Sequence, residues 1–563
     1  MSSSLLPWLA HYEKEVPQSL DYANIPLHTY LENAHRKFPE AAALNFMGKT
    51  LTFRELYRET ELFSRVLQHL GIEKEDRVAL MLPNSPQAVI AYYATLQIGA
   101  IVVQTNPMYM ERELEHQLSD SKATVMVCVD LVYEKVVKVF PKTQLEHIIV
   151  TSVKDYLPFP KNVLYPLKLR KEGTKINIPR DPSVLHWSNV MEQSLPEMRK
   201  PDIVPAEDLA LLQYTGGTTG LAKGVMLTHA NLVANTEQVR VWCHNVQEGK
   251  ERILAVLPFF HVYGMTAVMN FAMLLAAELL LIPKFDADTI LKTINKMRPT
   301  LFPGAPPMYV ALIHHPELQN YDLGSIEACI SGAAPLPREV QEKFEHVTGG
   351  RLVEGYGLTE SSPVTHANPI WGRRKNGSIG IPIPDTEAKV VDPETGEELP
   401  PGEIGELVVR GPQVMKGYWN RPEETVNSLK DGWLYTGDMA TMDEEGYFYI
   451  VDRKKDMIVA GGFNIYPREV EEVLYGHEAV LECAVAGIPD EYRGETVKAY
   501  VVLKKGKNVS GDELEQFCRE RLSAFKVPRL YEFRDDLPKA LAGKVLRRVL
   551  VEEEKKKAQR GQT

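Results

Sequence analysis

The chain has 563 residues and a mass of 63.5 kDa, which excludes a single small module and corresponds to several folding units. Its 64 Lys and Arg against 75 Asp and Glu give a net charge of −11, which argues against a protein that binds nucleic acid by neutralising phosphates. With 44% hydrophobic and 25% charged residues, the composition is that of a folded globular protein, and disorder is not expected.

The cysteines and the N-terminal segment indicate a cytoplasmic protein. The five cysteines are widely spaced and never form CxxC pairs, which is not typical of a disulfide framework or a structural zinc site. Residues 1–15 lack the basic segment and long apolar run of a secretory signal. The most apolar stretch, 265–282, is interrupted by Asn270 and Glu278, so we interpret it as a buried helix followed by a strand. Peripheral membrane contact and a homodimer are left open.

The first 150 residues show an alternation of helix-like and strand-like segments. This pattern predicts a parallel sheet with helices on both faces. Helices are predicted over 54–71, 85–99 and 111–123, and strands over 77–83, 101–107 and 124–130.

The rest of the chain divides by texture. Residues 156–205 are rich in Pro, Lys and Arg with weak periodicity, so we interpret them as a connector or surface excursion, and a second α/β run begins near Leu209. From about Gly372, short strands predict a small β-barrel-like unit. We therefore predict an α/β protein: a large N-terminal domain, 1–452, of two α/β subdomains plus the β unit, and a mobile C-terminal α+β domain, 453–563.

The strongest local motif is YTGGTTGLAKGVMLTHANL, residues 214–232. We interpret it as a strand, a turn dense in Gly and Thr, and then a helix. Glycines let backbone amides approach an anion, threonine hydroxyls add donors, a helix start favours negative charge, and Lys223 adds a positive charge. The pattern is that of a phosphate-binding loop, but it is not a Walker A loop, because Ala222 precedes Lys223 where that motif requires Gly. A P-loop kinase or ATPase is therefore disfavoured.

Five motifs in the expected order resemble the adenylate-forming superfamily of acyl-CoA synthetases, luciferases and peptide-synthetase adenylation domains. They are the loop above, EGYGLTE (354–360), the block from DGWLYTGD to VDRKK (431–455), GGFNIYP (461–467) and PKALAGKVLRR (538–548). The 431–455 block is similar to the signature of fatty acyl-CoA synthetases.

The resemblance implies a two-step reaction that needs ATP with Mg²⁺, and coenzyme A as co-substrate. A carboxylate is a poor electrophile, so the enzyme joins it to the α-phosphate of ATP, releases diphosphate and holds an acyl adenylate that coenzyme A attacks. The leading hypothesis is a long-chain fatty acid CoA ligase. The alternatives are a medium-chain or aryl-acid (coumarate-like) CoA ligase, a fatty acyl-AMP ligase that loads a carrier protein, and a non-catalytic nucleotide-binding or acyl-sensing protein.

The resemblance also implies the nucleotide site. Lys544 matches the lysine that bridges the carboxylate and the α-phosphate, and Glu360 matches the Mg²⁺ ligand, with Thr215 near the metal. Asp438 matches the carboxylate that accepts both ribose hydroxyls. The implied ATP- and AMP-binding residues are Thr215, Gly216, Gly217, Thr218, Thr219, Gly220, Lys223, Gly332, Ala333, Ala334, Glu354, Gly355, Tyr356, Gly357, Thr359, Asp438, Arg453 and Lys544.

The remaining assignments concern the hinge, coenzyme A and the acyl chain. Lys455 matches the hinge of the C-terminal domain, and Gly461 and Gly462 match the approach of the thiol. His261 matches a position that gates the acyl site, where amino-acid-activating domains usually carry Asp, so an amino acid substrate is disfavoured. The candidate catalytic residues are Lys544, Glu360, Thr359 and His261. The implied acyl pocket comprises His261, Tyr263, Gly264, Gly304, Ala305 and Pro306.

Overall fold

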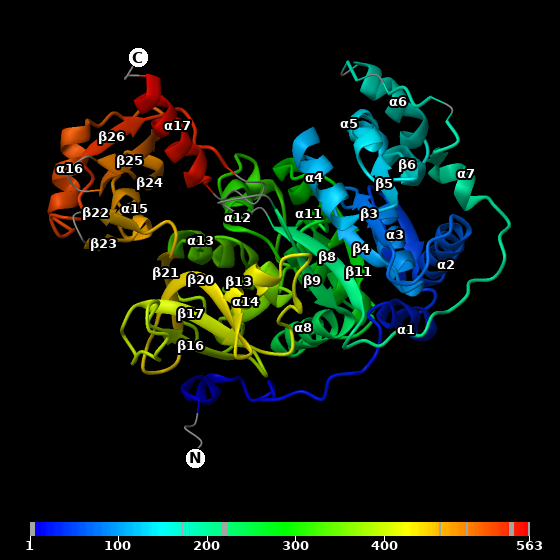
Figure 1. Ribbon diagram of the computed structural model, residues 1–563, viewed down its shortest axis with the longest axis horizontal. Coiled ribbons are helices and arrows are strands. Elements are labelled where there is room, and N and C mark those ends of the chain that lie inside the picture. The colour runs from blue at the N-terminus through cyan, green and yellow to red at the C-terminus, as the bar shows by residue number, and fades with distance from the viewer. Residues whose placement is uncertain are drawn as a thin grey trace. The chain divides into compact units, whose positions relative to one another are not determined.

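The computed structural model describes residues 6–560, apart from 172, 175, 180, 216–221, 461–462, 491–493 and 540–544. The chain forms two compact units, the first made of residues 1–387 and 410–434 and the second of 388–409 and 435–563. The first unit contains two large sheets covered by helices (Figure 1), as expected for the predicted α/β class. Much of the predicted β unit therefore belongs to the same compact unit as the C-terminal residues. The predicted division into a domain 1–452 and a mobile domain 453–563 stays a prediction.

The larger sheet of the first unit has eight strands. β3, β4, β5, β6, β7 and β8 run parallel. β9 pairs antiparallel with β8, and β18 pairs antiparallel with β9. In order across the sheet, the strands are β18 (Gly417–Tyr418), β9 (Lys223–Thr228), β8 (Leu209–Thr215), β4 (Ile101–Gln104), β3 (Arg77–Met81), β5 (Val125–Val129), β6 (His147–Thr151) and β7 (Val184–His186).

The predicted alternation in the first 150 residues is confirmed. α2 (Phe53–His69), α3 (Pro86–Gln97) and α4 (Glu111–Ser121) occupy the expected places. Ala79 and Met81 of β3 point to one face, where they meet Leu114 and Leu118 of α4 and Val136 of α5 (Tyr133–Val139). Successive strand residues point to opposite faces, and α3 packs against β3 and β4.

The segment 156–205 is more regular than the expected connector. It contains α6 (Lys161–Lys171), then β7, which pairs with β6 at the sheet edge, and α7 (Trp187–Met191). Its low periodicity follows from its position at the outer end of the sheet, where a short strand buries little apolar surface (Figure 1).

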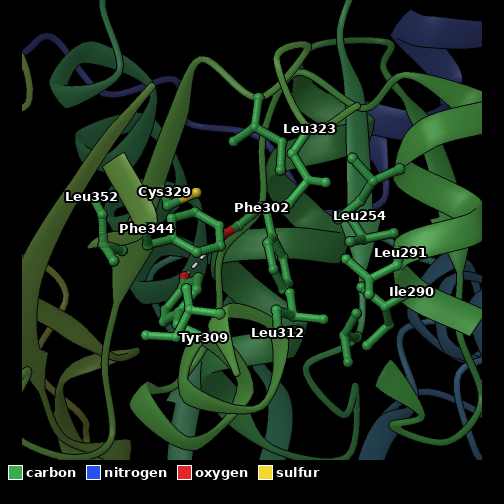
Figure 2. Close-up of a cluster of buried hydrophobic side chains, with 14 of the residues drawn as sticks. Leu254, Ile290, Leu291, Phe302, Tyr309, Leu312, Leu323, Cys329, Phe344 and Leu352 are labelled. Atoms are coloured by element: carbon green, nitrogen blue, oxygen red, sulfur yellow. Dashed lines mark hydrogen bonds between the residues drawn. The ribbon is translucent and has the colours of Figure 1, made fainter. Parts of the chain in front are cut away.

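The second sheet of the first unit encloses a hydrophobic core. Figure 2 shows the rings of Phe302, Tyr309 and Phe344 packed together, with the Tyr309 hydroxyl donating to the carbonyl of Phe302 at 2.9 Å. α11 (Ala287–Met297), α12 (Pro306–Ile313) and α13 (Arg338–Thr348) supply side chains to this core. The strands are β2 (Lys49–Thr52), β1 (Ala42–Phe46), β11 (Glu278–Leu281) and β10 (Arg252–Ala255), followed through a bridge at Leu301 by β12 (Ala328–Ser331), β13 (Arg351–Gly357), β14 (Val364–Ala367) and β15 (Ile381–Pro382).

Buried helices lie between the two sheets. α1 (Thr29–Lys37) and α8 (His229–Trp242) pack against the segment after residue 261, which contains α9 (Val262–Gly264), a π-helix (Met265–Asn270) and α10 (Phe271–Leu274) and leads into β11. The prediction of a buried helix and strand over 265–282 is confirmed. Among the helices of the described residues, none has the length and apolar character to cross a bilayer.

The second unit carries two smaller sheets. The α+β character predicted after residue 453 is confirmed by α15 (Pro467–Tyr475), β24 (Val480–Asp490), β25 (Gly494–Leu503) and α16 (Gly511–Arg519). One sheet has the order β16 (Glu387–Val391), β17 (Gly405–Arg410), β20 (Trp433–Met442) and β19 (Leu429–Lys430), with β21 (Phe448–Arg453) paired to β20. The other joins β23 (Phe463–Ile465), β22 (Ile458–Ala460), β25 and β24, with β26 (Leu530–Phe533) beside β25 and α17 (Arg547–Arg560) packed on β24.

Candidate active site

The Gly- and Thr-rich loop connects two antiparallel strands. Thr215 ends β8, and Lys223 lies opposite it at the start of β9. Gly216, Gly217, Thr218, Thr219 and Gly220 lie outside the described residues.

The prediction of a helix directly after this loop is wrong. Val225 and Leu227 are buried one strand period apart, so the residues after the loop form β9. α8 begins only at the far end of β9, where Thr228 and Asn231 form a capping box. The dipole of α8 therefore does not point at the loop, and an anion there would depend on backbone amides, hydroxyls and Lys223.

A chain of polar contacts joins Lys223 to Glu360. The Lys223 ammonium pairs with the carboxylate of Glu424 on α14 (Pro422–Ser428) and lies 4.9 Å from the ring centroid of Tyr418. The Tyr418 hydroxyl donates to Oε1 of Glu360 at 2.8 Å. Burial and the Glu360 carboxylate raise the pKa of Tyr418, so its hydroxyl stays protonated and remains a donor.

Tyr418 and Glu424 were not among the residues expected at the site from the sequence. Tyr418 reaches Glu360 because β18 pairs with β9, which places Tyr418 opposite Val225. It is 58 residues from Glu360 in the chain, and nothing local to the sequence around Tyr418 indicates the contact. Glu360 itself follows Thr359 in a short 3₁₀ turn after β13, as the LTE motif suggested.

Gly357, at the end of β13, lies very close to the backbone of Pro363. A Cβ on Gly357 would lie 2.0 Å from the carbonyl oxygen of Pro363, so only glycine fits. The preceding Tyr356 lies opposite His366 on β14, with the two rings edge to face and 6.0 Å apart. Glu354, earlier on β13, is buried and accepts a hydrogen bond from the backbone N–H of Leu336 at 3.2 Å.

The structure brings the expected nucleotide and acyl residues together around Gly332. Its N–H donates to the carbonyl of Gly304 at 3.1 Å, and a Cβ at Gly332 would lie 3.0 Å from Cε1 of Tyr263. The Tyr263 hydroxyl is fixed on the carbonyl of Ile330 at 2.7 Å. Ala333 follows in the left-handed region with φ of 69°. The backbone at Gly332 thus lies directly against Tyr263 and Gly304 of the expected acyl pocket.

His261 stands at the entrance to α9. Its Nδ1 accepts the backbone N–H of Tyr263 at 3.3 Å, which fixes the neutral tautomer with a proton on Nε2. Part of the side chain is accessible to water. The protein atoms packed around the imidazole still desolvate it in part, and this desolvation lowers its pKa. Gly264 is required here, because a Cβ would lie 2.3 Å from the carbonyl oxygen of Pro258. Ala305 and Pro306 begin α12.

In the second unit, Asp438 and Arg453 form a cross-strand pair. They lie opposite each other on β20 and β21, and Nε of Arg453 is 2.6 Å from Oδ1 of Asp438. The Asp438 side chain is 3% exposed and that of Arg453 34% exposed. Asp438, which was assigned to the ribose, and Arg453, which was assigned to the nucleotide, are therefore brought together within this unit.

The predicted hinge lies in a turn that an arginine clamps. Lys455 is exposed in the turn between β21 and β22. Nη1 of Arg547 lies 3.3 Å from Asp452 and 3.4 Å from Asp456, and its Nη2 lies 2.6 Å from Glu471 on α15. Arg547 belongs to the PKALAGKVLRR motif, but nothing in the sequence indicates this contact. Lys544, Gly461 and Gly462 lie outside the described residues.

Comparisons with known proteins agree with these motifs. Residues 31–419 match the family described as AMP-binding enzyme, and 469–544 match its C-terminal domain. The chain is 56% identical to a long-chain-fatty-acid–CoA ligase of Bacillus subtilis over 549 residues, 97% of this chain and 98% of the relative. It is 42% identical to the enzyme of the same name from Yersinia pestis over 98% of both chains. The ATP-bound structure of MatB from Rhodopseudomonas palustris matches with a TM-score of 0.82 at 30% identity, covering 94% of this chain and 99% of that chain. The chain therefore belongs to the AMP-binding enzyme family.

Proposed function

We propose that this enzyme joins a long-chain fatty acid to coenzyme A at the expense of ATP and releases AMP and diphosphate. The carrying observation is the contact of Gly332 with Tyr263 and Gly304. It sets the backbone assigned to the nucleotide against the wall assigned to the acyl chain, so the carboxylate and the α-phosphate can meet there. The likeness to long-chain ligases over nearly the whole chain supports the choice of substrate.

The first step forms the acyl adenylate. A carboxylate oxygen of the fatty acid attacks the α-phosphorus, and the bond from that phosphorus to the bridging oxygen breaks, so diphosphate leaves. Lys223 and the amides and hydroxyls of 215–220 would bind the phosphates, and Lys544 would bridge the two reacting oxygens. Asp438 would accept the ribose hydroxyls, with Arg453 holding its carboxylate in place.

Glu360 fits a Mg²⁺ ion that is bound mainly by substrate. Within the described residues, no group of three or more His, Cys, Asp or Glu side chains could hold a metal alone. Mg²⁺ commonly takes one or two carboxylates and completes its shell with water and substrate phosphates, which suits a single carboxylate oriented by Tyr418. When bound, the ion would neutralise charge on the phosphates.

The second step transfers the acyl group. The thiolate of coenzyme A attacks the carbonyl carbon, and the bond to the AMP oxygen breaks. We propose that the part after residue 452 turns about Lys455 between the two steps, which withdraws Lys544 and brings Gly461 and Gly462 to the thiol.

The five cysteines are free and buried, which supports a reducing, cytoplasmic setting.

The test is product formation from a panel of acids. The purified protein is mixed with MgATP and acids from acetate to stearate, plus coumarate, with and without coenzyme A. We expect acyl-CoA and AMP, with the highest kcat/KM for long chains. A maximum at medium-chain or aryl acids would replace the substrate, and diphosphate release without acyl-CoA would favour a carrier protein as acceptor.

A variant tests the catalytic assignment. Lys544→Ala should lower the rate of adenylate formation by at least about a hundredfold, because it removes charge from the forming bond. Lys539→Ala is the matched control, since Lys539 lies in the same segment but is paired with Glu482. Equal rates for Lys544→Ala and wild type would contradict the role of Lys544, and no turnover with any acid would contradict the proposed function.

A further inference from the structure

The segment 256–261 joins the end of β10 to the start of α9 and forms no helix or strand of its own. We call it the wall segment, because it ends at His261 and leads to Tyr263, both assigned to the acyl pocket. A buried stretch without a ladder of hydrogen bonds needs partners for its backbone groups from elsewhere in the fold. The side chains that supply these partners therefore decide where the acyl pocket stands.

Asn84, which lies between β3 and α3 of the larger sheet, supplies three of these partners. Its Nδ2 donates to the carbonyls of Ala255 and Leu257, both at 2.9 Å. Its Oδ1 accepts the backbone N–H of Phe259, also at 2.9 Å. The side chain is buried, and its two amide protons and its oxygen are all used. A carboxamide supplies two N–H donors and an acceptor together, which neither a carboxylate nor an ammonium does.

Gln213, on β8 of the same sheet, also holds the wall segment. Its Nε2 donates to the carbonyl of Phe260 at 3.0 Å, and the side chain is buried. Gln213 lies two residues before Thr215, on the strand that leads into the Gly- and Thr-rich loop. The larger sheet thus fixes the residue directly before His261 as well.

Close backbone packing passes the position of the wall segment on to α9. A Cβ on Gly264 would lie 2.3 Å from the carbonyl oxygen of Pro258 and 2.7 Å from that of Leu257. The Leu257 carbonyl is one of the groups that Asn84 holds. A shift of the wall segment would therefore displace Gly264 and, with it, the neighbouring Tyr263.

We propose that Asn84 and Gln213 are positioning residues for recognition of the fatty acid. They contact the backbone of the wall segment, so they would act on the substrate through His261 and Tyr263. The clamp itself rests on four hydrogen bonds between the larger sheet and the residues that follow β10 or end it. Its consequence for the acid rests on the proposed function, because that function assigns the acyl chain to this pocket.

The variant Asn84→Asp tests the clamp with almost no change of shape. It removes two donors and sets a carboxylate against two carbonyl oxygens, so the KM for the acid that wild type turns over best should rise about tenfold or more. The KM for ATP should not change, because Gly332 keeps its own hydrogen bond to Gly304. A lower kcat with an unchanged KM for the acid would show only a loss of folded enzyme and would contradict the positioning role.

The matched control is Gln87→Glu. Gln87, on α3, is buried and donates at 2.9 Å to the Thr151 hydroxyl and to the Ser152 carbonyl. The change removes the same number of donors from the same sheet but does not touch the wall segment. It should leave the KM for the acid at the wild-type value, and an equal rise in Asn84→Asp and Gln87→Glu would contradict the proposal.

The variant Gln213→Leu keeps the proposal testable should Asn84→Asp fail to fold. It removes one donor at similar volume, so the KM for the acid should rise about fivefold. Its control is Gln117→Leu on α4, because Gln117 also donates one bond to a backbone carbonyl, that of Gln104 at 2.8 Å. Oε1 of both glutamines is buried without a hydrogen-bond partner among the described residues, which makes the pair well matched. An unchanged KM in Gln213→Leu would contradict its positioning role.

Hydrogen exchange followed by mass spectrometry tests the clamp without any turnover. In the unliganded protein, the amides of 256–264 should exchange about tenfold faster in Asn84→Asp than in wild type, and at the wild-type rate in Gln87→Glu. Unchanged exchange in Asn84→Asp would contradict the clamp. If exchange is faster but wild type turns over no acid, only the proposed function is contradicted. Turnover by wild type with an unchanged KM for the acid in both clamp variants would contradict only the positioning role.

Discussion

Within the part of the chain that the structure describes, Tyr418 connects Lys223 with Glu360, the carboxylate assigned to Mg²⁺. Its ring lies under the Lys223 ammonium, and its hydroxyl holds Glu360. Fixing this carboxylate matters for a metal ion that takes few ligands from the protein, because most of its other ligands come from substrate and water.

The variant Tyr418→Phe should therefore act through the metal. It removes the hydrogen bond to Glu360 and keeps the ring below Lys223, so we expect the Mg²⁺ concentration for half-maximal rate to rise about tenfold. Titration of adenylate formation with Mg²⁺ measures this effect. Tyr449→Phe, which removes a hydroxyl bonded to Asp443 in the second unit, is the control. An unchanged Mg²⁺ requirement in Tyr418→Phe would contradict the positioning role.

Asp438 should act on the nucleotide. The variant Asp438→Asn keeps the shape but leaves one acceptor oxygen, so we expect the KM for ATP to rise about tenfold. Steady-state kinetics at saturating fatty acid measure it. Glu406→Gln is the matched control, because Glu406 is a buried carboxylate paired with Lys454 at 2.8 Å in the same unit. The same rise of KM in both variants would show a general loss of structure instead.

The site residues that the sequence indicated are those that lie in compact motifs. Glu360, Asp438 and Arg453 could be assigned because each sits within a short string that the superfamily shares. Tyr418 and Arg547 could not, because their roles depend on partners 58 and 76–95 residues away in the chain. Only the pairing of β18 with β9, and of α17 with the turn after β21, creates these contacts.

At the scale of elements, the helix α17 is tied to the predicted hinge through one guanidinium. Arg547 at its start contacts Asp452 and Asp456, the residues that flank the turn of Lys455, and also Glu471. Burial raises the pKa of Glu471, and the positive charge of Arg547 opposes this rise. The charged form of the Glu471 carboxylate therefore depends on Arg547. A rotation about Lys455 would therefore keep the contacts of Arg547 with Asp456 and Glu471 and would change its contact with Asp452.

The variant Arg547→Gln should destabilise the second unit. Removing one partner of a largely buried ion pair leaves Glu471 without its counter-charge, and we expect a loss of about 3 kcal/mol in the free energy of unfolding. Calorimetry of the full chain measures it. In contrast, Arg519→Gln breaks an exposed pair with Glu515 on α16 and should cost less than about 1 kcal/mol. Equal melting of the two variants would contradict the clamp.

The elements themselves were largely predictable where the apolar period was strong. The helical period of α2 and the apolar run of β3 predicted the alternation of helices and strands that builds the first half of the larger sheet. The prediction after Lys223 was wrong, because a helix was expected directly after the Gly- and Thr-rich loop. The alternation of buried Val225 and Leu227 indicates the strand β9 instead. The apolar period also failed at β7, where three half-buried residues carry too short a pattern.

At the scale of the whole molecule, buried neutral histidines make the first unit sensitive to acid. Burial lowers the pKa of His28 to about 4 and those of His229 and His366 to about 3. Below pH 6.5 the unfolded chain binds protons that the folded chain does not, so stability is lost as the pH falls from 6.5 towards 4. Each such histidine contributes a slope of about 1.4 kcal/mol per pH unit in that window.

The variant His229→Asn should flatten this dependence. Its amide oxygen can replace Nδ1 as acceptor of the Leu27 N–H, but it does not titrate. We expect the free energy of unfolding to fall with pH between 6.5 and 4.5 more steeply in wild type than in the variant. The two slopes should differ by about 1.4 kcal/mol per pH unit, the contribution of one histidine. The control His314→Asn changes an exposed histidine that bonds only within its own helix turn. Parallel pH profiles for wild type and His229→Asn would contradict the account.

One measurement shows most directly which bond of ATP breaks in the reaction. The protein is mixed with MgATP and palmitate without coenzyme A, quenched within one turnover and analysed by mass spectrometry, and coenzyme A is added to a second portion before the quench. We predict palmitoyl-AMP and diphosphate in equal amounts in the first portion, and palmitoyl-CoA with AMP in their place in the second. Formation of ADP and phosphate, or a palmitoyl-AMP that coenzyme A does not consume, would contradict the account.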